Sequence, residues 1–297
     1  MPRFIKLVKT NAENLLRIAL QGAITHSAVP SSYLTTWDGR SQLSMGRGGI
    51  VYNVKIGDPC HGWALGDSLE PGVSSDGAGT DREKGGYRNL SSIGNKVKII
   101  SGEAKGEWGT VVGKVGRVPS GGRHIILHFK DEILDKLTIG DKVQIRANGI
   151  GLKLVDYPEV NVVSCSPELL ERWGVEDHGG KLNVPVTKVV PVDYVGCGAG
   201  SSPPQTNSWD IQTQSPDAKE FVKGMKYGDI VLLENTMSLY GQGYHKGAVT
   251  VGIIITGPSS RMGNGISVTP LLCSKNGEIV PILDPNANLR KILELED

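Results

Sequence analysis

The chain has 297 residues, of which 32 are Lys or Arg and 31 are Asp or Glu, so its formal net charge is +1. A charge this close to zero gives no global field that attracts nucleic acid or an anionic membrane, and neither partner is expected. The start of the chain lacks the apolar core of a signal peptide, and no apolar run approaches the ~18 residues of a membrane span. These features predict a soluble, cytoplasmic protein.

Glycine is unusually frequent, at 40 of 297 residues, which is about twice its usual share. Together with short runs of valine and isoleucine, this predicts many turns between short strands. The aromatic share is only 5%, so aliphatic side chains must form most of the core. The cysteines lie far apart without a CxxC motif, which predicts reduced and mostly buried thiols at Cys60, Cys165, Cys197 and Cys273.

The first third of the chain predicts two strands and a long glycine-rich loop. Apolar and polar residues alternate over 16–24, and an apolar run over 50–56 stops at Gly57-Asp58-Pro59. Residues 60–86 are too rich in glycine for a regular element and too long for a simple turn. Loops of this length are often functional, so this one is either a solvated connector or a source of inward-facing polar residues.

The next segment predicts a small β-module at 92–155, inserted into a larger β-domain formed by 1–91 and 156–297. Strand patterns recur at 123–130 and 141–146, and Asn148-Gly149 is a strong turn signal. The spacing of apolar and glycine residues resembles the KOW motif of SH3-like barrels (Val97, Ile99, Gly102, Gly106, Gly109 and Val111). The resemblance implies RNA or ribosomal partners, but no arginine-rich run or stacking platform accompanies it, so a structural role is favoured.

The second half predicts further strands and two helices. Ser166-Pro167-Glu168 begins a helix over 167–173, and the tail over 286–296 suits an amphipathic helix. A proline-interrupted run over 184–195 predicts an edge strand. Short β-branched runs at 230–233, 248–255 and 266–273 predict buried strands. The fold class is therefore mainly β, a sandwich- or barrel-like core with an inserted SH3-like module.

Polar residues in three loops form the candidate site. No GxSxG, HExxH or clustered Cys/His pattern is present. Carboxylates with histidine can hold a divalent metal ion or perform acid–base work, so a metal is considered. We expect one cleft lined by catalytic candidates His61, Asp67, Glu70, Asp210, Tyr244 and His245, and by ligand-binding candidates Asn207, Tyr240 and Lys246. In the alternative, His245 is a surface histidine and His61 only packs beside Trp63.

Four strings resemble a bacterial and archaeal protein family whose function is unknown and which spans nearly the whole chain. They are GDPCHGWALGDSLEPGVS (57–74), NSWDIQT (207–213), YGQGYHKGAVTVGIIITG (240–257) and GNGISVTPLLCS (263–274). The resemblance is specific for membership and implies no activity.

Asn207 and Asp210 upstream of the 240–247 hairpin are also similar in order to acetamidase/formamidase enzymes. That likeness implies hydrolysis of a small amide, although residues 233–237 replace the Gly-Asp-x-His of those enzymes. Three functions stay open: a hydrolase of a small amide-like substrate, a non-catalytic protein that binds a small molecule or partner, and an RNA-binding protein. A homo-oligomer is also considered.

Overall fold

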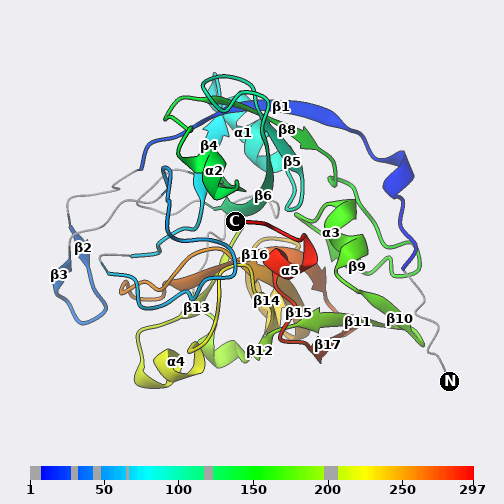
Figure 1. Ribbon diagram of the computed structural model, residues 1–297. Helices are drawn as coiled ribbons and strands as arrows, with labels where there is room; N and C mark the ends of the chain where they lie inside the picture. The colour runs from blue at the N-terminus through cyan, green and yellow to red at the C-terminus, as the bar shows by residue number, and fades with distance from the viewer. Residues whose placement is uncertain (1–7, 28–32, 43–47, 65–66, 117–122, 197–206) are drawn as a thin grey trace.

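The computed structural model describes residues 8–27, 33–42, 48–64, 67–116, 123–196 and 207–297. A closed barrel lies at the top of Figure 1, and the strands of the C-terminal half lie below it. The predicted mainly-β class with a barrel is confirmed.

The barrel contains six strands, and each pairs antiparallel with both neighbours. In order around the barrel they are β1 (Ile18–Ile24), β4 (Val73–Gly77), β7 (His124–His128), β6 (Trp108–Val115), β5 (Lys96–Ile99) and β8 (Lys142–Ala147). The strands expected over 16–24 and 141–146 are confirmed as β1 and β8. The alternation predicted for 16–24 is seen in β1, whose side chains alternate in exposure along the strand. Val143, Ile145 and Ala147 point into the barrel core.

The barrel is not built from residues 92–155 alone, which corrects the predicted inserted module. Four of its strands come from that segment, but β1 and β4 precede it and close the barrel between β8 and β7. The physical reason is that four strands leave two unpaired edges, and closure removes them. The strand expected over 50–56 is also absent from this described stretch, where only Ile50 forms a bridge, to Val73.

A helix that the sequence reading missed follows β4. Helix α1 (Asp81–Leu90) begins with a capping box, in which the Thr80 hydroxyl accepts from the Glu83 N–H and the Glu83 carboxylate accepts from the Thr80 N–H. Tyr87 on its inner face is buried and hydrogen-bonds Ser75 of β4 at 2.8 Å. The helix therefore covers one side of the barrel.

We expect the Thr80→Ala variant to lose ~1 kcal/mol of unfolding free energy, because the cap satisfies backbone N–H groups that the first turn leaves unpaired. Urea denaturation measures the loss. Thr80→Ser keeps the hydroxyl and is the control. Equal losses in both variants would contradict a role for this hydrogen bond.

The C-terminal half forms two sheets. The larger contains β12 (Lys188–Val190), β14 (Ile230–Met237), β15 (Gly243–Ile254), β16 (Gly265–Ser274) and β13 (Trp209–Gln212) in that order, with β9 (Val160–Val162) also paired to β16. The smaller contains β10 (Glu176–His178), β11 (Lys181–Val186) and β17 (Ile279–Leu283). The three buried runs are thus confirmed as strands. The run over 184–195 is divided into β11 and β12, of which only β12 is an edge strand, because β11 lies between β10 and β17.

Short elements complete the chain. They are β2 (Leu34–Thr35), β3 (Ser41–Gln42), α2 (Asp131–Leu134), α3 (Pro167–Arg172), α4 (Pro216–Phe221) and α5 (Leu289–Ile292). Helix α3 matches its prediction, and Ser166 caps it by accepting from the Leu169 N–H. The helix expected over 286–296 is shorter than predicted. Within the described ranges, no helix is long and apolar enough to cross a membrane.

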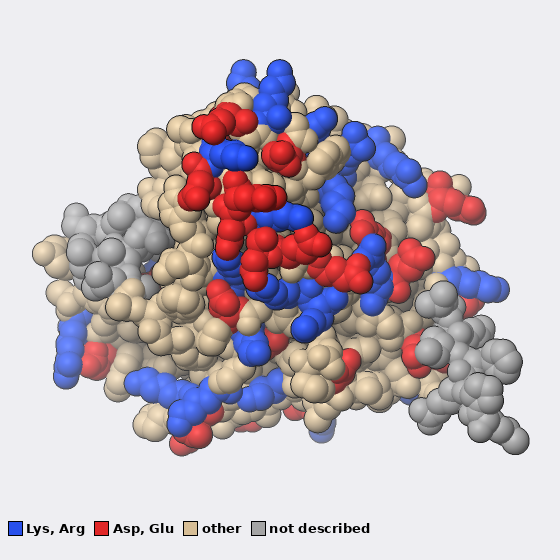
Figure 2. Space-filling model, viewed as in Figure 1, with Lys and Arg blue, Asp and Glu red and all other residues tan. Residues whose placement is uncertain are grey.

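Barrel and C-terminal sheet share one hydrophobic core. At their contact the Thr269 hydroxyl of β16 donates to the Lys114 carbonyl of β6 at 3.0 Å. Figure 2 shows acidic and basic side chains interleaved on the face viewed. The ion pairs of the structure include Lys55 with Asp131 and Arg172 with Glu294. Cys60, Cys165 and Cys273 are buried free thiols as expected, while Cys197 lies outside the described residues.

Candidate functional site

The loop that carries the first group of predicted residues is attached to the C-terminal half of the chain. The Gly57 N–H donates to the Tyr227 carbonyl at 2.8 Å, and the Cys60 N–H donates to the Met225 carbonyl at 3.0 Å. At the other end of the loop, the Gly257 N–H donates to the Leu69 carbonyl at 2.7 Å. These bonds attach the loop to the segment before β14 and to the turn after β15.

Asp67 is buried at the turn that follows β15. Its residue is 3% exposed, and its Oδ1 accepts from the Ser259 hydroxyl at 2.9 Å and from the Ser260 N–H at 3.1 Å. Its Oδ2 is also buried and has no hydrogen-bond partner among the described residues. The next residue, Ser68, has a φ of 55°, a left-handed conformation that is uncommon outside glycine. Backbone strain of this kind often accompanies a functional arrangement.

Glu70 connects the same loop to the barrel. It is 2% exposed, and its Oε2 lies 2.5 Å from Nε2 of His124 on β7. Its Oε1 is buried and lacks a partner in the described part of the chain. The sequence reading missed His124, because it treated 123–130 only as a strand. A histidine in a run that is otherwise aliphatic was the available signal.

Gln214 also holds the 258–264 turn. Its Nε2 donates to the carbonyls of Ser259 and Arg261 at 2.8 Å each, and also to that of Asn264. Its Oε1 is a third buried acceptor without a partner in the described ranges. Thr213 strengthens the same turn by donating its hydroxyl to the Ser259 carbonyl at 2.8 Å.

His61 lines a small hollow of about 180 Å³ together with Cys60, Trp63, Leu69 and Pro258. Its Nε2 is buried and unpartnered within the described residues. Burial lowers the pKa of His61 and so favours its neutral form. The Cys60 thiol has a raised pKa, first because of burial and second because of the charge on Asp229, so it is not an activated nucleophile.

A second group of predicted residues surrounds Trp209 of β13. Asp210 is buried and accepts from the Ser267 hydroxyl at 2.7 Å. The Tyr244 hydroxyl donates to the Val195 carbonyl at 2.9 Å, and its ring meets Trp209 edge-on at 5.8 Å. Asn207 is fully buried, yet both its amide atoms are without partners among the described residues.

The other predicted residues of the hairpin lie at the surface. Tyr240 is 91% exposed, and His245 and Lys246 are exposed on β15. A strand advances ~3.3 Å per residue, so His245 lies roughly 30 Å from Ile254 at the end of β15, where the His61 loop is attached. The structure therefore separates the expected single cleft into a buried group at the barrel and another near Trp209.

The divalent metal ion considered from the sequence would need several ligands placed together within the described ranges. Across the described residues, no group of three or more His, Cys, Asp and Glu side chains is placed to hold a metal ion. The buried carboxylates at Asp67 and Glu70 contact hydroxyl, N–H and imidazole groups instead.

Two family models together match most of the chain. The one described as "Domain of unknown function (DUF4438), N-terminal" matches residues 33–171, and its C-terminal counterpart matches residues 172–293. The chain belongs to the DUF4438 family. A solved structure titled "Crystal structure of TM1086" is 37% identical, with a TM-score of 0.88, covering 95% of this chain and 98% of that chain. No curated protein matches the chain.

The buried polar residues around Asp67 and Glu70 come from both DUF4438 parts. Asp67, Glu70 and His124 belong to the N-terminal part, whereas Ser259 and Gln214 belong to the C-terminal part. Both parts are therefore needed to form it. The comparisons show neither the acetamidase/formamidase likeness nor the KOW-like segment.

Proposed function

We propose that this DUF4438 protein binds a small molecule with several N–H donors, an amine or an amide, where the loop of Asp67 and Glu70 meets the 258–264 turn. The observation that carries this proposal is the pair of buried carboxylates. Each is at most 3% exposed, and each has one oxygen without a hydrogen-bond partner among the described residues.

The proposal rests on the cost of burying unpaired acceptors. An ionised carboxylate removed from water is strongly disfavoured unless donors or cations compensate it. Ionised carboxylate oxygens only accept, and the third unpaired atom, Oε1 of Gln214, is an acceptor as well. Ammonium, guanidinium and amide N–H groups are the complementary chemistry.

We expect small amines and amides to raise the melting temperature of the wild-type protein in a screen that includes putrescine, agmatine, guanidinium and acetamide. For the compound that binds, Asp67→Asn and Glu70→Gln should each weaken affinity at least tenfold by calorimetry, since a hydrogen bond to a charged group is worth about 1.5–3 kcal/mol. Asp135→Asn, at an exposed carboxylate directly after α2, is the matched control. Binding that is unchanged in both site variants would contradict the proposal.

Hydrolysis of an amide at the same place is the second candidate, favoured by the 2.5 Å contact between Glu70 and His124. A carboxylate in contact with an imidazole can orient the ring and accept or supply a proton. Release of ammonia from acetamide or formamide would measure such an activity. If it occurs, Glu70→Gln should abolish turnover while retaining measurable binding; turnover unaffected by this change would exclude the pair as the proton-transfer group.

A further inference from the structure

A basic face with one aromatic ring lies on the outside of the barrel, away from the Asp67 loop. Cross-strand pairing places Trp108 and Thr110 of β6 beside Lys98 and Lys96 of β5, and Lys96 in turn beside Arg146 of β8. Val97 and Ile145, which lie between them on β5 and β8, point into the barrel, so these five side chains lie on its outward face. Thr110 is the one of the five that is buried there. We call them the Trp108 face.

Trp108 contacts two cations that have no carboxylate partner in the part of the chain that the structure describes. It is 39% exposed, with the Arg146 guanidinium carbon 4.5 Å and the Lys98 ammonium 5.4 Å from the ring centroid. The negative face of the indole ring attracts such cations. Neither Lys98 nor Arg146 forms an ion pair with a carboxylate in the described ranges. Both charges therefore remain available to an anion.

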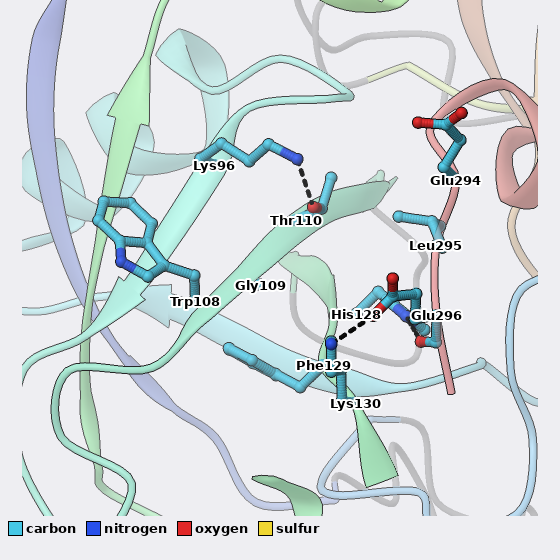
Figure 3. Close-up of a pocket in the computed structure, with 10 residues that line it drawn as sticks. All are labelled: Lys96, Trp108, Gly109, Thr110, His128, Phe129, Lys130, Glu294, Leu295 and Glu296. Carbon is cyan, nitrogen blue, oxygen red and sulfur yellow. Dashed lines mark hydrogen bonds and ion pairs between the residues drawn. The ribbon is translucent and has the colours of Figure 1, made fainter. Parts of the chain in front are cut away.

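The Trp108 face lies between two hollows. One, of about 530 Å³, is lined by Arg17, Lys96, Arg146, Trp108 and the amides of Asn95 and Asn148, among others. The other, of about 380 Å³, is lined by Trp108 and Thr110 and by the tail residues Glu294–Glu296. Figure 3 shows the Lys96 side chain reaching the Thr110 hydroxyl in this second hollow. Glu168 is the one acidic residue of the larger hollow among the described residues and lies 4.0 Å from Lys96. The larger hollow is thus basic and of a size that holds small ligands.

We propose that the Trp108 face binds a mononucleotide, with the base stacked on the indole and the phosphate held by Arg146, Lys96 and Arg17. A planar base matches the indole, and phosphate matches the Arg146 guanidinium, which forms no ion pair among the described residues. The ammonium of Lys96 lies 4.0 Å from Glu168, a long contact that a phosphate can replace. Trp108 is the one exposed aromatic ring of the described residues on β1, β5, β6 and β8. Surfaces for single strands stack successive bases on several rings, so one ring favours a single nucleotide. This site is independent of the one at Asp67 and Glu70.

The test is calorimetric titration of the full chain with AMP, GMP, UMP and CMP, alongside adenosine, inorganic phosphate and ten-residue oligonucleotides. We expect at least one nucleoside monophosphate to bind, and to bind at least tenfold more tightly than adenosine or phosphate. Trp108→Ala and Arg146→Gln should each weaken that binding tenfold or more, while Trp108→Phe keeps a ring and restores part of it. Trp37→Ala is the control for an exposed tryptophan elsewhere.

Three results would overturn the proposal. The first is that no monophosphate binds while melting curves show every variant folded. The second is that affinity is the same in Trp108→Ala and wild type. The third is that an oligonucleotide binds more than a hundredfold more tightly than any monophosphate, which would assign the face to a strand instead of a free nucleotide.

Discussion

Replacing Lys114 with methionine is expected to stabilise the protein at pH 6 and to have little or slightly adverse effect near pH 10. Lys114 of β6 is 1% exposed, and its ammonium donates to the Ser91 carbonyl at 2.8 Å. Burial lowers its pKa from 10.5 to about 7. A charged lysine is thus disfavoured in the folded protein, and methionine has a similar volume without the charge.

The direction of the pH effect follows from proton binding. Between pH 7 and 10.5 the unfolded chain keeps the proton on Lys114 and the folded chain releases it, so wild-type stability rises with pH through this window. Below pH 7 the folded protein carries the full cost, on the order of a few kcal/mol at 1.36 kcal/mol per pKa unit. Loss of the donor to Ser91 offsets part of the gain in the variant.

Urea denaturation of wild type and Lys114→Met at pH 6 and pH 9.5 measures how much the variant gains in unfolding free energy at each pH. The exposed strand residue Lys142 supplies the control, since Lys142→Met should show no such pH-dependent gap. If the difference in unfolding free energy between Lys114→Met and wild type were the same at both pH values, Lys114 would stay charged in the folded state.

The second large effect is expected at Gly265 of β16. A Cβ atom there would lie 1.7 Å from the Ile211 carbonyl oxygen and 2.6 Å from the Ile211 carbonyl carbon. Because the obstacle is backbone of the neighbouring strand β13, no side-chain rotation relieves it. Gly265→Ala must therefore separate the two strands, and we expect a loss on the order of 3 kcal/mol.

The same change tests how the second polar group is positioned. Separation of β13 from β16 would move Asp210 away from the Ser267 hydroxyl, now at 2.7 Å. Gly243→Ala is the matched control, since a Cβ at this strand glycine meets no atom within 4 Å. Urea denaturation and near-UV circular dichroism should report a large change for Gly265→Ala only. Similar losses in both would indicate that β-strand glycine content, and not this close contact, sets the stability.

The sequence contains the capping signal of helix α1, although the sequence analysis did not predict this helix. Thr80 and Glu83 have the capping-box spacing, and both hydrogen bonds form. Gly85 and Gly86 inside the helix lower its intrinsic propensity, because glycine costs ~1 kcal/mol relative to alanine. The glycine-rich composition of 60–86 therefore predicted a loop, while packing of Tyr87 against Ser75 and the barrel favours the helix.

The sequence by itself determined the local elements. Period-two alternation predicted β1, a strand pattern over 141–146 predicted β8, short β-branched runs predicted β14, β15 and β16, and a Ser-Pro-Glu start predicted α3. Each of these signals is contained within about ten neighbouring residues, since side-chain alternation and capping act between residues close in the chain.

Only the tertiary structure decided which distant residues meet. Glu70 and His124 are 54 residues apart in sequence, and Asp67 and Ser259 are 192 apart. Long-range pairing also closes the barrel through β1 and β4. It likewise sets the register that places Trp108 beside Lys98. The alternation in a strand specifies which face is buried but does not specify its partner. Burial of one shared core selects those partners, and with them the contacts that form both candidate sites.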